Sequence, residues 1–179
     1  SAAAAQVKGE PGGDSKNSSG FEALFEDLNP EIKAADIAFA NLETPVSTTG
    51  VRGAEAFIFN ASPDLLAALK NLGLTVLSVA NNHMYDQEEV GLVETLAELK
   101  KIGFEYVGAG ENREEAENPV ILEKNGIKIA FLGTTEFLNK NLNVDSSTAP
   151  RVNVFDPALA IIAIQKAREH ADFVVVSVH

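Results

Sequence analysis

The chain has 179 residues, of which 45% are hydrophobic, and its formal net charge is −12. This length and apolar content are enough for one domain with a buried core. The surplus of negative charge repels a phosphate backbone, so the composition argues against a nucleic-acid partner. The sequence contains no cysteine, which excludes disulfide frameworks, thiolate nucleophiles and zinc sites built from cysteine.

The first 35 residues divide into a polar stretch and an apolar stretch. Residues 1–20 are small and polar, which predicts a flexible entry segment. Residues 21–35 carry apolar side chains at spacings of three and four, as an amphipathic helix does. Pro30 lies inside that pattern and predicts a break or the start of a second helix.

Short apolar runs then alternate with helix signals. Residues 36–40 and residues 74–80 are apolar and short, as buried strands are. Between them, Pro63 at a first helical position and Gly73 as a stop signal predict a helix. This alternation favours an α/β fold.

A further helix and strand follow the second apolar run. Asp86 with Glu89 three residues later resembles a capping box, which predicts a helix ending near Gly103. Residues 104–107 then read as a short strand.

The last third of the chain adds antiparallel character. Residues 120–132 form a hairpin pattern around Asn125 and Gly126. Asp156, followed by a proline, predicts the cap of another helix. Residues 173–178 are a continuous apolar run, which predicts a strand buried on both faces.

Together these elements predict an α/β layered domain with mixed sheets. We expect the strands at residues 36–40, 74–80 and 173–178 to lie parallel as neighbours. The sequence stops at the tip of the last of these strands, where a domain seldom ends, so we expect a partial domain.

Polar residues follow each of these three strands. Asn41 and Glu43 follow the first strand, Asn82 and His83 follow the second, and His179 follows the third. Ligands of α/β sheets bind in the crevice beyond the carboxyl ends of the strands, so these side chains are expected to converge. Carboxylate, amide and imidazole ligands without a thiol suit a divalent ion such as Mn, Fe, Zn or Mg.

Each of these residues also has a simpler interpretation. Two asparagines after a strand are most often a turn, because asparagine tolerates left-handed backbone geometry. Glu43 alone reads as a solvated loop carboxylate, and His179 alone as a chain end. Three such strand ends in one chain nevertheless favour a site.

Several segments resemble one family when they are taken in order. They are ADIAFANLETPV, LSVANNHMYDQEEVGLVETLAEL, FEYVGAGENREEAENPVI, IKIAFLG and FVVVSVH. Across residues 21–179 they resemble the capsule-synthesis proteins of the CapA type, also called PgsA in poly-γ-glutamate production. That family is similar to the calcineurin-like metallophosphatases, so the resemblance implies a layered sandwich of mixed β-sheets flanked by helices.

The resemblance also implies roles for individual residues. Asn82 and His83 match the Asn-His pair of the metallophosphatases, in which the amide binds metal and the imidazole helps the leaving group depart. Glu43 takes the place of a metal-binding acid, and His179 resembles a histidine ligand. The resemblance therefore implies a divalent metal held by Glu43, Asn82 and His179, with His83 as the catalytic residue.

The chain departs from the family pattern at several positions. Met84 stands where the broader phosphatases have a carboxylate, and Asp86 either compensates for it or caps its helix. Gly13 and Asp14 follow no predicted strand, so the opening Gly-Asp motif is not assigned. A closing histidine-rich motif would lie beyond His179, so the domain at residues 21–179 is expected to be incomplete at both ends.

Two functions follow from the resemblance. The first is a surface-exposed or membrane-anchored bacterial protein of capsule synthesis or export, with a metal-dependent hydrolase site for a phosphoester or an anionic polymer. The second is a non-catalytic assembly factor that binds membrane synthase subunits or the growing polymer.

Overall fold

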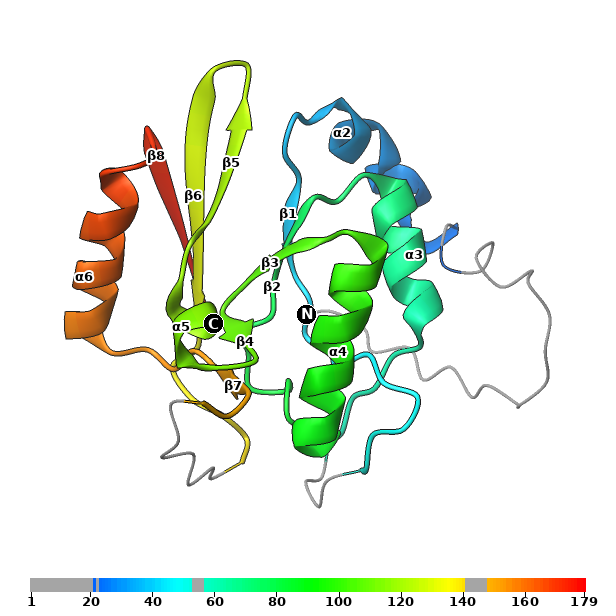
Figure 1. Ribbon diagram of the computed structural model, residues 1–179. Helices are drawn as coiled ribbons and strands as arrows, with labels where there is room; N and C mark the ends of the chain where they lie inside the picture. The colour runs from blue at the N-terminus through cyan, green and yellow to red at the C-terminus, as the bar shows by residue number, and fades with distance from the viewer. Residues whose placement is uncertain (1–20, 22, 53–56, 141–147) are drawn as a thin grey trace.

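The computed structural model describes residues 21, 23–52, 57–140 and 148–179. The predicted entry segment at residues 1–20 lies outside these residues, so the division into that segment and a domain at 21–179 stays a prediction. Figure 1 shows two β-sheets between helices, with α3 and α4 beyond one sheet and α6 beyond the other. The predicted layered sandwich is therefore confirmed.

Two short helices open the described chain. A 3₁₀ helix, η1 (Ala23–Leu28), runs directly into α2 (Asn29–Ala34). Pro30 lies in the first turn of α2, where its missing N–H group costs no helical hydrogen bond. The predicted second helix start at this proline is confirmed.

The first sheet contains three parallel strands in the order β1 (Phe39–Asn41), β2 (Val76–Ser78) and β3 (Glu105–Val107). In its register Asn41 lies opposite Ser78, so both strands end at the same level of the sheet. The strands are shorter than predicted, but the parallel pairing of the first two predicted strands is confirmed.

Two helices cover the outer face of the first sheet, namely α3 (Pro63–Leu72) and α4 (Glu88–Ile102). Each ends at a glycine with left-handed backbone geometry, Gly73 after α3 and Gly103 after α4. Among the described residues, no helix has the length and apolar character needed to cross a membrane.

The second sheet has the order β5 (Val120–Lys124), β6 (Ile127–Thr134) and β8 (Phe173–Val178). The first two of these strands form the predicted hairpin, in which Asn125 and Gly126 both have positive φ. The third strand runs parallel to β6.

The remaining elements connect the two sheets or cover the second one. Helix α6 (Pro157–Arg168) lies against the second sheet, and Asp156 caps it, as predicted, by accepting hydrogen bonds from two backbone N–H groups. Short strands β4 (Ala109–Gly110) and β7 (Arg151–Val152) pair antiparallel, and α5 (Arg113–Glu117) follows β4.

Two predictions for residues 173–178 are wrong. This strand, β8, lies in the second sheet beside β6 and is not a neighbour of β1 or β2. It is also not buried on both faces, because Phe173 is 61% exposed and Val178 is 52% exposed. The reason is its place in the sheet: among the described strands β8 pairs only with β6, so one edge stays accessible.

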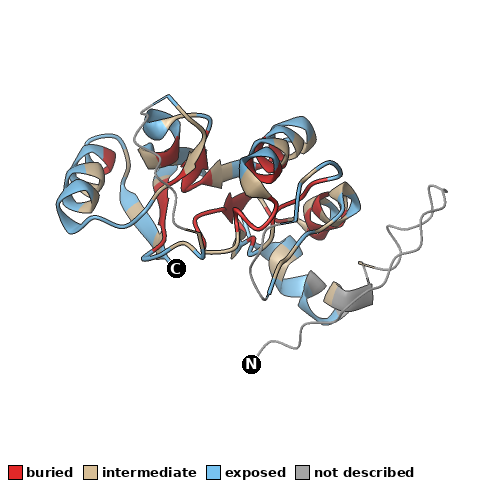
Figure 2. Ribbon diagram, turned by 90° about the horizontal axis from the view of Figure 1, so that it is seen from below, coloured by how far each residue is buried: buried red, intermediate tan, exposed pale blue. Residues whose placement is uncertain are grey.

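The interface between the two sheets is apolar. Val76 and Val107 from the first sheet and Phe131 from the second are buried against one another, and the ring of Phe39 stacks on Phe131 at 5.6 Å. A larger core lies between the first sheet and its helices and includes Leu77. Figure 2 shows buried residues gathered on the strands and on the helix faces turned toward them. This packing holds the ends of strands from both sheets together.

Gly108 follows β3 of the first sheet and lies against Gly133 on β6 of the second. Its φ is +86°, and a Cβ placed there would lie 2.4 Å from the Cβ of Ala80 and 3.0 Å from the carbonyl carbon of Gly133. Gly103 also has a positive φ, of +80°, but a Cβ there would meet no atom within 4 Å. Both glycines therefore have a backbone conformation that is unfavourable for alanine, but only at Gly108 would a side chain also clash with its neighbours.

We expect Gly108→Ala to lower the free energy of unfolding by about 2–5 kcal/mol, because overpacking adds to the cost of a left-handed alanine. Gly103→Ala, the matched control, should cost only the conformational term of about 1–2 kcal/mol. Urea unfolding measures both values. Equal losses in the two variants would contradict the close approach of the sheets at Gly108.

Candidate functional site

Side chains from the ends of three strands meet at one edge of the sandwich. Nε2 of His179 lies 2.9 Å from Oδ1 of Asn82 and 3.5 Å from Oε1 of Glu43. We call Glu43, Asn82 and His179 the strand-end cluster. The structure brings these predicted residues together even though His179 follows a strand of the second sheet, because the two sheets end at the same edge.

The amide of Asn82 has a defined orientation. Its Nδ2 donates to Oδ1 of Asn139 at 2.8 Å, which turns its own Oδ1 toward His179. The backbone N–H of Asn139 also donates to the carbonyl of Asn82 at 3.3 Å. Sequence analysis missed Asn139, whose only signal was that it follows β6, a fourth strand ending at this edge.

The other two asparagines in this region have a structural role. Asn81 is fully buried, donates through Nδ2 to the carbonyl of Leu42 at 2.8 Å and accepts the backbone N–H of His83 at 3.1 Å. Asn41 accepts a hydrogen bond from Asn81 at 3.4 Å, and among the described residues it makes no hydrogen bond to the strand-end cluster. The turn interpretation therefore holds for Asn81, and the expected convergence of Asn41 with the cluster is not seen.

His83 is paired with Asp86 at the entrance to α4. Nδ1 of His83 lies 2.7 Å from Oδ2 of Asp86, whose side chain is only 2% exposed. A carboxylate only accepts hydrogen bonds, so Nδ1 of His83 is the nitrogen that donates to Asp86, and Nε2 is the nitrogen left for proton exchange. This pair orients the imidazole.

The predicted capping box at Asp86 and Glu89 is wrong. The N-cap of α4 is Gln87, which makes no side-chain cap, and the carboxylate of Asp86 instead accepts from His83 and from the backbone of Phe59. The local pattern fits a cap, but these tertiary partners take the carboxylate. Of the two alternatives for Asp86, the helix cap is wrong, and compensation for the missing carboxylate at Met84 stays a prediction.

The two residues between His83 and Asp86 point into the core. Met84 is fully buried, so the departure from the phosphatase pattern at this position lies outside the site. Tyr85 is buried too; its hydroxyl accepts the backbone N–H of Val152 and donates to the carbonyl of Pro150. Burial raises the pKa of Tyr85 to about 12, so the phenol stays protonated and anchors the turn.

The connection between β1 and α3 borders the imidazole. The ring of Phe59 lies 4.2 Å from the ring of His83, measured between centroids, with an interplanar angle of 32°. The backbone N–H of Phe59 donates to Asp86 at 2.7 Å, and its carbonyl accepts from Gln87 at 3.1 Å. This connection is thereby attached to the turn that carries His83.

Glu94 on α4 holds the start of the same connection. Its carboxylate accepts from the hydroxyl of Ser47 at 2.5 Å, from the hydroxyl of Thr49, and from the backbone N–H groups of Thr48 and Thr49 at 3.0 and 3.2 Å. These hydrogen bonds, the one from Ser47 foremost, lower the pKa of Glu94 to about 2. Ionised Glu94 therefore acts as an anchor for residues 47–49.

The strand-end cluster has the ligand types that a divalent ion accepts. It offers a carboxylate oxygen, an amide oxygen and an imidazole nitrogen, all directed toward one another. Within the described ranges, no group of three or more His, Cys, Asp or Glu side chains could hold a metal ion. The strand-end cluster has two side chains of these types, Glu43 and His179, and the amide of Asn82, so it fits part of a coordination shell.

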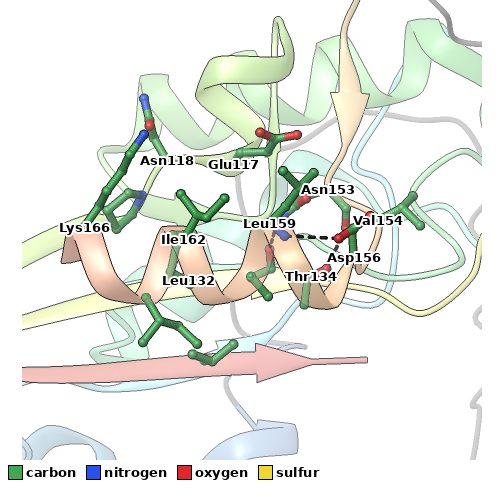
Figure 3. Close-up of a pocket in the computed structure, with 16 residues that line it drawn as sticks. Glu117, Asn118, Leu132, Thr134, Asn153, Val154, Asp156, Leu159, Ile162 and Lys166 are labelled. Carbon is green, nitrogen blue, oxygen red and sulfur yellow. Dashed lines mark hydrogen bonds between the residues drawn. The ribbon is translucent and has the colours of Figure 1, made fainter. Parts of the chain in front are cut away.

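A separate cavity of about 190 Å³ lies between α6 and the second sheet. Figure 3 shows Leu132, Leu159 and Ile162 along it, with Asn118 and Lys166 toward one end. None of the residues in the strand-end cluster lines this cavity. The polar site and the cavity are therefore distinct features.

Comparison with known sequences identifies relatives in capsule synthesis. The family model described as "Bacterial capsule synthesis protein PGA_cap" matches residues 3–179. The chain is similar to "PGA biosynthesis protein CapA" of Bacillus subtilis (strain 168), with 34% identity over 89% of the chain and 43% of that protein. It is also similar to "Capsule biosynthesis protein CapA" of Bacillus anthracis, with 31% identity over 91% of the chain and 41% of that protein. The chain spans less than half the length of these relatives.

A solved structure shows the same fold. The NAD nucleotidase NadN of Haemophilus influenzae superposes with a TM-score of 0.53 over 89% of this chain and 31% of that chain, at 22% sequence identity. This likeness supports the metallophosphatase-like fold that the sequence resemblance implied.

The anchor at Glu94 predicts a defined pH dependence. The pKa of Glu94 in the folded chain lies below its ordinary value of 4.5, so the ionised carboxylate stabilises the fold fully above pH 4.5. That contribution is lost as the pH falls from 4.5 toward 2. We expect Glu94→Gln to be less stable than the unchanged chain at neutral pH, with a difference that shrinks on acidification through this range.

Urea unfolding at a series of pH values measures this difference. Glu98→Gln is the matched control, because Glu98 lies one turn further along α4 and its ion pair is with the exposed Lys101. A deficit for Glu94→Gln that does not change with pH would contradict the anchoring role.

Proposed function

Because the chain belongs to the bacterial capsule synthesis protein family PGA_cap, we propose that it acts in the synthesis or export of an anionic capsule polymer through a metal-dependent hydrolase site. The observation that carries this proposal is the strand-end cluster beside the pair of His83 and Asp86. A group that can bind metal and a group that can transfer a proton lie on adjacent residues, Asn82 and His83, and phosphoester hydrolysis at a metal site uses both kinds of group.

The residues proposed to hold a divalent ion are Glu43, Asn82 and His179. When bound, such an ion polarises a phosphoryl oxygen and lowers the pKa of a bound water. The neutral amide of Asn82 adds an oxygen ligand without adding negative charge, which matters for an anionic substrate in a chain with net charge −12. Mn, Fe, Zn and Mg all suit this ligand set.

His83 is the proposed proton donor. Its Nδ1 is engaged by Asp86, so the ring is held with Nε2 as the nitrogen that gives a proton to the departing oxygen. Asp86 is a positioning residue, because it acts through the imidazole. A partner of this kind holds the ring in one tautomer and one orientation.

The proposed setting is the cell surface, with the protein exposed or anchored there. The similarity to proteins named for PGA biosynthesis and capsule biosynthesis supports this setting. The proposed substrate is a phosphoester or an anionic polymer, and membrane synthase subunits are the proposed protein partners. An acidic chain with 26 Asp and Glu against 14 Lys and Arg does not attract a polyanion over its whole surface, so the proposed contact is confined to the metal site.

A second candidate is an assembly factor without catalysis. Strand β8 favours it, because β8 pairs only with β6 among the described strands, and an accessible strand edge can accept a strand from a protein partner. Its exposed apolar side chains, among them Phe173 and Val178, would add to such a contact. In this candidate function the strand-end cluster is a remnant of the fold or a structural ion site.

Two substitutions separate the proposed roles in the protein at its full natural length. Glu43→Ala should lower the bound metal, because water does not replace the charge of a carboxylate ligand. His83→Ala should keep the metal but lower turnover of a phosphodiester by about 10²–10⁴-fold, the usual contribution of a proton-transfer group. Elemental analysis and a bis(4-nitrophenyl) phosphate assay measure the two quantities.

Glu105→Ala is the control, because Glu105 is an exposed carboxylate on β3. It should change neither metal content nor turnover. A chelator should abolish hydrolysis in the unchanged protein. A folded protein that binds synthase subunits but has neither metal nor hydrolase activity would contradict the enzyme proposal and support the assembly factor.

A further inference from the structure

We infer that Phe59 is a positioning residue for His83, so that the connection between β1 and α3 holds the proton donor in place. This inference rests on the proposed function, in which His83 transfers the proton. Phe59 contacts the turn in three ways: its ring packs on the imidazole, its N–H donates to Asp86, and its carbonyl accepts from Gln87. No other described residue has both a ring contact with His83 and a hydrogen bond to Asp86.

The hydrogen bonds of Phe59 and His83 converge on one atom. Oδ2 of Asp86 accepts the backbone N–H of Phe59 at 2.7 Å and lies 2.7 Å from Nδ1 of His83. Asp86 is almost fully buried, so water does not replace either partner at low cost. A shift of the backbone at Phe59 therefore moves the carboxylate that orients the imidazole.

The ring of Phe59 restricts the imidazole from its face. The side chain of His83 is 12% exposed, and the phenyl ring lies against it at a tilt that aromatic pairs favour. Asp86 holds one edge of the imidazole while Phe59 covers a face. Together they leave the ring little room to turn to another rotamer.

The backbone that directly follows Phe59 is itself anchored. Val46 and Ala61 form a parallel bridge, and the amide of Asn60 both accepts from the N–H of Ser47 and donates to its carbonyl. Ser47 is in turn held by Glu94 on α4. The position of Phe59 is thus set by the fold, as a residue that orients another must be.

The test compares three substitutions. Phe59→Leu removes the ring, Phe59→Tyr restores it, and Phe57→Leu is the matched control because Phe57 is 78% exposed. The first readout is the His83 side-chain rotamer, measured by NMR three-bond couplings and by NOEs between His83 and Asp86. The second is turnover of bis(4-nitrophenyl) phosphate by the protein at its full natural length.

We expect Phe59→Leu to give averaged His83 rotamers and to lower kcat about tenfold with little change in KM, a loss typical of residues that orient a reacting group. Phe59→Tyr should restore both readouts, and Phe57→Leu should change neither. If Phe59→Leu does not fold, Phe59→Met keeps the apolar volume without a ring, and the same expectations apply to it.

A single His83 rotamer in the ring-free variant would overturn the inference, and so would an unchanged kcat in an active protein. If the unchanged protein hydrolyses no phosphoester, the proposed function fails, while the rotamer measurement still decides whether Phe59 holds His83. The two failures are therefore distinguishable.

Discussion

The apolar contact between the two sheets determines where the polar residues of the site lie. Val76 and Val107 from one sheet pack on Phe131 from the other, and this contact brings the end of β8 to the ends of β1 and β2. His179 then lies 2.9 Å from Asn82, although the two residues are 97 positions apart and belong to different sheets. The site is therefore a property of the sandwich, since neither sheet alone contains it.

A buried carboxylate is the second constraint. Asp86 is almost completely removed from water, so its oxygens need partners within the protein. It finds them in the imidazole of His83 and in the backbone of Phe59, which ties the turn after β2 to the connection after β1. The hydrogen bond that satisfies the buried carboxylate of Asp86 also orients the imidazole of His83, so the stability of the fold and the proposed chemistry both depend on it.

Local signals in the sequence predicted much of the fold and of the site. The predicted site residues were polar residues that closely follow apolar runs, namely Glu43, Asn82, His83 and His179. A short stretch of sequence is enough to recognise such a position. The sequence did not predict which sheet β8 joins, because that depends on its pairing with β6. A run of apolar residues suits a central strand and an edge strand equally. Asp86 matched a helix cap locally but bonds to a residue 27 positions away, and Phe59 and Asn139 carried no local motif at all.

Paramagnetic broadening by Mn²⁺ tests most directly whether the strand-end cluster is a metal site. In NMR spectra of the chain titrated with low concentrations of Mn²⁺, we expect the signals of Glu43, Asn82 and His179 to broaden first and together. The acidic surface offers a natural comparison, because residues 111–117 hold four glutamates, none of which is a predicted ligand. Broadening that begins there, or that spreads evenly over the acidic surface while the cluster stays sharp, would contradict the account.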